Sequence, residues 1–66
     1  MNTLDDLIKQ YNLKPSSMEQ KYGRCGNYVV ITNERKYLTY RTLIIAELSA
    51  ETYNGIVIEV LPIELE

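Results

Sequence analysis

Few side chains in this sequence could support acid–base or nucleophilic chemistry. The chain has no histidine, the residue that most often transfers protons near neutral pH. Its one thiol, Cys25, follows Arg24, whose charge could make it more reactive, but no activating base lies nearby in the sequence. The adjacent carboxylates Asp5 and Asp6 are better explained as charges at the start of a helix. We therefore predict that the protein has no catalytic residues and is not an enzyme.

The residues also argue against a bound metal or cofactor. One cysteine without any histidine cannot make a zinc site. The run Gly23-Arg24-Cys25-Gly26 has the G-x-x-G spacing of loops that clamp a nucleic-acid backbone. In those loops a helix follows, whereas the next residues here favour a strand. We expect no cofactor and no metal, and we interpret the run as a loop.

Cations and tyrosines are concentrated in the segment 21–41. Glu34 is the only acid there, and the segment 42–66 has five acids and no base. Cations on phosphates and rings under bases are typical of single-strand binding, while Tyr and Arg also anchor protein interfaces. A solvated hairpin tip would explain the same residues. The net charge of −2 favours a protein partner, with a nucleic-acid-binding or transcription-accessory module as the alternative. The residues concerned are Lys21, Tyr22, Arg24, Tyr28, Arg35, Lys36, Tyr37, Tyr40 and Arg41.

Two helices are expected in the first 22 residues. Leu4, Leu7, Ile8 and Tyr11 recur at helical spacing, which predicts an amphipathic helix over about residues 3–13. Pro15 prevents that helix from continuing. A short helical turn is expected to follow, over residues 15–22, with Gly23 at its end.

A β-hairpin is expected next, from segments 28–32 and 37–42, both rich in β-branched and aromatic residues. A loop of either two or four residues pairs Thr32 with Tyr37 and sends Tyr28, Tyr37 and Arg41 to one face. We predict that this face and the loop bind the partner. The predicted partner-binding residues are Tyr28, Arg35, Lys36, Tyr37 and Arg41.

The second strand is expected to run on to Leu48, and a third to cover residues 56–61 after the turn signal Asn54-Gly55. A helix over residues 35–50 is the competing interpretation. The threonines Thr39 and Thr42 and the pair Ile44-Ile45 count against it. The prediction is thus an α+β fold, a single domain over residues 1–66, with the N-terminal helix packed on a three-stranded antiparallel meander.

The outer face of that sheet would be half apolar. A chain of 66 residues buries only about 60% of its unfolded surface, and it cannot form an internal disulfide. We therefore expect self-association, most simply a homodimer, unless another part of the chain covers this face. The predicted oligomer interface is Leu43, Ile45, Val57 and Leu61.

The sequence shows no signal peptide, and its longest apolar run is only Leu43 to Ala46, so we expect no membrane attachment. A lone thiol fits a reducing compartment, so we expect a cytoplasmic protein. The predicted function is that of a small interaction protein without catalysis. An inhibitor or accessory subunit fits, of the kind that phages and mobile elements encode, an interpretation that rests on size alone.

Overall fold

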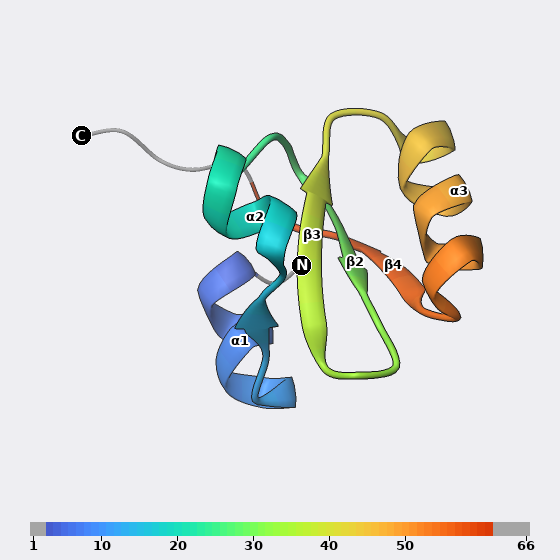
Figure 1. Cartoon of the computed structure of the whole chain (residues 1–66). Helices are drawn as coiled ribbons and strands as arrows, with labels where there is room; N and C mark the ends of the chain where they lie inside the picture. Colours follow the sequence, from blue (N-terminus) through green and yellow to red (C-terminus); the bar gives the residue numbers. More distant parts are fainter. Residues whose placement is uncertain (1–2, 62–66) are drawn as a thin grey trace.

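Helices cover both faces of a four-stranded sheet in the computed structural model, which describes residues 3–61 (Figure 1). Helices α1 and α2 lie on one side of β3 and β2, and α3 lies on the other (Figure 1). The elements in chain order are α1 (Leu4–Tyr11), β1 (Lys14–Pro15), α2 (Ser17–Tyr22), β2 (Tyr28–Ile31), β3 (Lys36–Tyr40), α3 (Leu43–Tyr53) and β4 (Ile56–Glu59).

The sheet has the strand order β1-β3-β2-β4 and is mixed. Strand β2 is antiparallel to both β3 and β4, while the two-residue β1 is parallel to β3. Strands β3 and β4 therefore run in the same direction on either side of β2, and α3 connects them. The expectation of an α+β fold with an N-terminal helix on the sheet is confirmed. The three-stranded antiparallel meander is corrected to this mixed sheet.

The loop between β2 and β3 has three residues, Asn33 to Arg35, and it fixes the register. Ile31 pairs with Tyr37, and the Thr32 amide donates to the Lys36 carbonyl at 2.8 Å. Arg35 adopts a left-handed conformation with φ of 62°, as in hairpins closed by a type I turn and a bulge. The prediction considered only even loop lengths, so its pairing of Thr32 with Tyr37 was wrong by one residue. A shift of one residue moves each side chain of one strand to the opposite face relative to its partner strand.

Adjacent residues of β2 are buried on opposite faces of the sheet. Val29 and Val30 are both 0% exposed. Val29 belongs to the core beneath α1, with Leu7, Leu13 and Val60. Val30 belongs to a second core beneath α3. A sheet buried on both faces requires a helix on each side, which explains why the chain must supply α3.

The segment from Leu43 to Tyr53 is helical, so the prediction of a strand up to Leu48 was wrong. The expected outer sheet face is therefore covered by α3. Both interpretations of the sequence treat residues 37–48 as one element, whereas a strand ends at Tyr40 and a helix begins at Leu43, after two intervening residues. The threonines counted against a helix include Thr39, in the strand, and Thr42, which is the helix cap.

Local signals at both ends explain where α3 begins and ends. The Thr42 hydroxyl accepts from the Ile45 amide at 3.4 Å, as N-cap side chains do. Asn54 ends the helix in a left-handed conformation, and the Gly55 amide donates to the Ala50 carbonyl at 2.8 Å. A side chain at Gly55 would collide with the Ile31 carbonyl, so this position needs glycine. The expected Asn54-Gly55 turn is a helix end.

Two substitutions test which side of α3 faces the sheet. Ala46 is 0% exposed against Val30, so Ala46→Leu is expected to cost about 1–3 kcal/mol through overpacking. Leu48 is 58% exposed, so Leu48→Ala should change stability by less than about 0.5 kcal/mol. Urea unfolding at a few micromolar protein measures both. In a strand the two side chains would lie on one face, and equal effects would contradict the helix.

Candidate functional site

The structure separates the residues that the sequence analysis grouped as a partner-binding surface. Tyr28 packs against the core beneath α3, and Tyr37 packs against the core beneath α1. Arg35 and Lys36 are exposed at one end of β3, and Arg41 is exposed beyond the other end. The expected face shared by Tyr28, Tyr37 and Arg41 does not form, because the hairpin register differs by one residue. Their role in binding stays a prediction.

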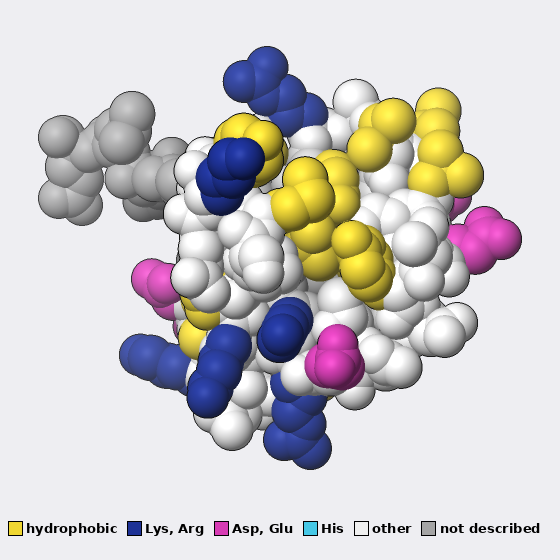
Figure 2. Space-filling model, viewed as in Figure 1, with side chains coloured by type: hydrophobic (Ala, Val, Ile, Leu, Met, Phe, Trp, Pro, Cys, Tyr) yellow, Lys and Arg dark blue, Asp and Glu magenta, His cyan; other side chains and the backbone are white. Residues whose placement is uncertain are grey.

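A groove runs along β3 between α2 and α3. Two hollows of about 180 and 110 Å³ both have Met18 and Leu38 in their walls. Apolar side chains gather on this face over β3 and between the two helices (Figure 2). The first hollow extends to Tyr53, and the second extends to Tyr22 and Arg41. The groove therefore has an apolar floor, with Lys36 near one end and Arg41 near the other.

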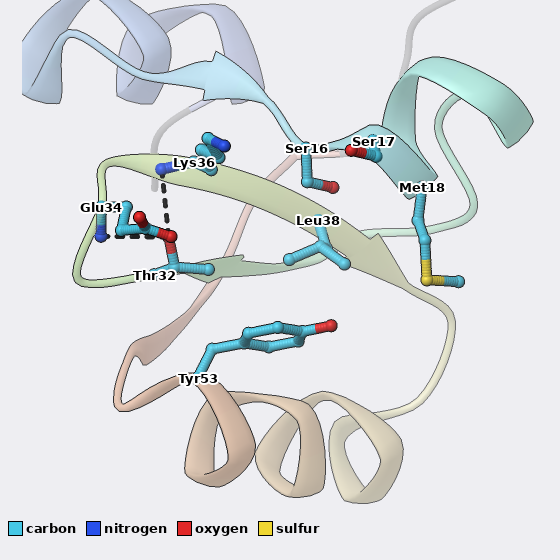
Figure 3. Close-up of a pocket in the computed structure, with 8 residues that line it drawn as sticks. All are labelled: Ser16, Ser17, Met18, Thr32, Glu34, Lys36, Leu38 and Tyr53. Carbon is cyan, nitrogen blue, oxygen red and sulfur yellow. Dashed lines mark hydrogen bonds between the residues drawn. The ribbon is translucent and has the colours of Figure 1, made fainter.

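The close-up shows how three elements build this groove (Figure 3). The Tyr53 ring extends from α3 beneath Leu38, and Met18 closes the far side from α2 (Figure 3). At the loop end, the Thr32 hydroxyl accepts from the amides of Glu34 and Lys36, at 3.3 and 3.2 Å (Figure 3). These hydrogen bonds hold the loop that positions the Lys36 side chain.

A buried carboxylate holds α2 against the edge of β3. Glu19 is 8% exposed and accepts from the Thr39 amide at 3.0 Å and from the Thr39 hydroxyl at 2.8 Å. The same hydroxyl accepts from the Cys25 amide at 2.8 Å. Strand β1 pairs only as far as Tyr37, so Glu19 replaces the missing backbone acceptor. These contacts explain Glu19 as a structural residue.

Four large aliphatic side chains are exposed on α3, and we call them the α3 patch: Leu43, Ile44, Ile45 and Leu48. Ile44 is 72% exposed and Leu48 is 58% exposed. The helix contacts the sheet through its alanines, Ala46 and Ala50, which are buried. Its large aliphatic side chains therefore remain outside, which is unusual for a helix of a small monomer.

Of the residues predicted to form an oligomer interface, two are exposed on α3. Leu43 and Ile45 belong to the α3 patch. Val57 is half-buried beneath α3, so it cannot share a surface with them. Leu61 is 40% exposed, and its carbonyl accepts from Arg24 at 2.9 Å. Arg24 also donates to Gly26 and Asn27, so it fastens the end of β4 to the loop before β2.

Two structural features are absent from residues 3–61. No group of three or more His, Cys, Asp or Glu side chains in this range is arranged to hold a metal ion. None of its helices is long and apolar enough to cross a membrane.

Comparisons of the chain with protein-family models, with curated proteins and with solved structures found no match.

Sequence reasoning missed Ile44 and Leu48 of the α3 patch, and Met18 of the groove. A strand over these residues would send Ile44 and Leu48 to the buried face of the sheet, because side chains of a strand alternate in steps of two. The signal that could have found them is the spacing of Thr42 and Asn54, two good helix caps that enclose eleven residues. Met18 has no sequence signal of its own, because the groove depends on how α2 packs.

The contribution of Glu19 to stability is testable. Glu19→Ala leaves the buried Thr39 amide without an acceptor, and we expect a loss of about 1–3 kcal/mol in the free energy of unfolding. Glu19→Gln keeps one carbonyl oxygen for that amide and should lose less. Urea unfolding of the three proteins gives the comparison. Equal stability of wild type and Glu19→Ala would contradict the structural role.

Tyr37 should make stability depend on alkaline pH. Burial raises the pKa of its phenol above the ordinary value of about 10, and the negative charges of Glu19 and Asp5 raise it further. The folded state thus favours the protonated phenol. The contribution of Tyr37 to the free energy of unfolding is therefore complete below the pKa of the unfolded state, and it is lost as pH rises through the pKa of the folded state.

The measurement is urea unfolding between about pH 8 and pH 11 for wild type and Tyr37→Phe. Wild type should lose more stability than the variant above about pH 10, since the remaining tyrosines are common to both. Parallel curves would show that Tyr37 has no such effect.

Proposed function

We propose that this chain is a small interaction protein without catalysis, which docks a protein partner through the α3 patch. The observation that carries the proposal is the orientation of α3, with alanines toward the sheet and four large aliphatic side chains in solvent. Exposed apolar surface of this kind reduces solubility unless a partner covers it. An inhibitor or accessory subunit would use such a surface.

The spacing of the patch suits docking of a helix into an apolar groove. Ile44 and Leu48 are four residues apart, and Ile45 and Leu48 are three apart, so they project as one stripe. Helical segments that bind grooves present anchors at these spacings. Truncating a central anchor in such an interface costs about 2 kcal/mol or more.

Charges beside the patch indicate the chemistry of the partner. Glu47 and Glu51 are exposed on α3, and the helix has no base in its last turn. The partner surface should therefore be apolar at its centre and have Lys or Arg at its rim. A two-fold contact of α3 with α3 would bring the glutamates of both copies together, so we favour a different protein over the expected homodimer.

The test is a pair of charge-matched variants. Ile44→Glu with Leu48→Glu places two carboxylates in the patch, while Gln10→Glu with Asn33→Glu adds the same charge at exposed positions on α1 and the β2–β3 loop. The immobilised wild-type chain and both variants are exposed to a lysate of the native host. A specific partner should bind wild type and the control, and its affinity for the patch variant should fall at least about 30-fold.

Light scattering of the same three proteins addresses self-association. If wild type is a dimer and the patch variant is a monomer, the partner of the patch is a second copy. If a captured protein binds the patch variant as tightly as wild type, the docking site lies elsewhere. If wild type captures nothing and is monomeric, the proposal is wrong.

A further inference from the structure

Four of the seven Lys and Arg residues are found on the elements that meet at the loop end of the sheet: Lys9, Lys14, Arg35 and Lys36. Basic side chains gather on this part of the surface, below the apolar groove (Figure 2). Lys14 and Lys36 are register partners in the parallel pair of β1 and β3. Like charges on directly paired positions destabilise a sheet, so this arrangement needs an explanation.

The backbone conformation of Arg35 is a second destabilising feature at the same place. Its amide donates to the Thr32 carbonyl at 3.1 Å, its carbonyl accepts from the Lys14 amide at 3.1 Å, and its φ of 62° is left-handed. Glycine or asparagine would adopt that conformation with less strain. A strained residue with an exposed charged side chain suggests a functional role for the side chain.

A hollow beside Arg35 contains groups that can contact a base. It measures about 230 Å³ and is lined by Gln10, Tyr11, Asn12, Leu13, Ile31 and Arg35. Tyr11 lines this hollow and is 38% exposed, so its aromatic side chain is partly accessible. The amides of Gln10 and Asn12 can donate to and accept from base edges. The hollow therefore combines a ring, two amides and a guanidinium.

We propose that this end of the molecule binds single-stranded nucleic acid, with phosphates on Lys14, Arg35 and Lys36 and a base on Tyr11. Cations along a backbone path with an aromatic platform beside them are the usual means of binding a single strand. Lys36 faces the groove and Arg35 faces the hollow, so the path crosses the edge of the sheet between them. This proposal is independent of the α3 patch.

The acidic net charge does not oppose this local site. Glu47 and Glu51 lie on α3, across the sheet from α1, and the molecule extends 35 × 25 × 24 Å. Charges separated by more than about 10 Å are largely screened at 0.1 M salt. Glu34, in the β2–β3 loop, is the acid closest in sequence to Arg35 and Lys36, and it leaves the cluster positive.

The other cations have contacts of their own. Arg24 donates to three backbone or side-chain oxygens, and Arg41 donates to the Cys25 carbonyl at 3.3 Å. Lys21 lies over the Tyr22 ring at 5.3 Å, at the end of α2. Lys21 is therefore a matched control for a lysine outside the cluster.

The experiment measures fluorescence anisotropy of a labelled thymidylate strand of about twelve nucleotides, between about 50 and 200 mM salt. Wild type should bind with an affinity that falls as salt rises. Lys14→Gln with Lys36→Gln should reduce the slope of log affinity against log salt by about 1.4, because each phosphate contact on a single strand contributes about 0.7. Lys21→Gln should reduce this slope less than Lys14→Gln alone or Lys36→Gln alone.

Two further variants distinguish nucleic acid from other polyanions. Tyr11→Ala should weaken binding of the thymidylate strand at least about fivefold and leave binding of inorganic polyphosphate unchanged. Arg35→Gly should weaken binding of both, although it relieves the strained backbone and should unfold at a similar urea concentration.

Absence of binding by wild type at the lowest salt overturns the proposal. So does an equal effect of Lys21→Gln and Lys14→Gln, which would indicate unlocalised attraction. Polyphosphate that competes as well as thymidylate, with no effect of Tyr11→Ala, would show a site for phosphate alone and would overturn the assignment to nucleic acid. Circular dichroism of each variant confirms that it is folded.

Discussion

The chain reverses between β2 and β3 in three residues, with Arg35 in a left-handed conformation and Thr32 hydrogen-bonded to Lys36. This odd loop length sets which side chains of β3 share a face with which side chains of β2. It places Tyr37 with Val29 and Ile31 beneath α1, and it places Tyr40 with Val30 beneath α3. Both helical layers therefore depend on one turn.

Two buried faces have a cost for a chain of this length. The buried side chains are divided between two small cores instead of one thicker core, and each small core must be covered by a helix. The layer beneath α3 is thin because α3 approaches through Ala46 and Ala50. The large residues of that helix then have no place inside, so the exposed patch follows from the way the cores are divided.

Much of the fold could be predicted from local signals. The helix α1 follows from its apolar stripe and from Thr3, whose side chain accepts from the Asp6 amide. The helix α2 ends at Gly23, as expected, and β2 and β4 lie in the segments chosen for strands. Each of these depends on residues close together in sequence, for which propensity and capping are good guides.

The remaining features depend on information that the sequence does not display locally. The turn at Arg41 and Thr42 has no glycine or proline, so the strand and the following helix could not be separated by a breaker residue. An arginine in a left-handed position gives no sign of a three-residue loop, because glycine or asparagine is the usual signal. The candidate surfaces were missed or misplaced for these two reasons.

The carboxylate of Glu19 also affects how this molecule meets other sheets. An unpaired strand edge can add a strand from another chain and so begin aggregation. On β3, the amide that β1 leaves free is already bound by a buried anion, and an incoming strand would have to expel α2 to reach it. Within the described residues, β4 ends the sheet order without such a cover, so any strand added by a neighbour should join at β4.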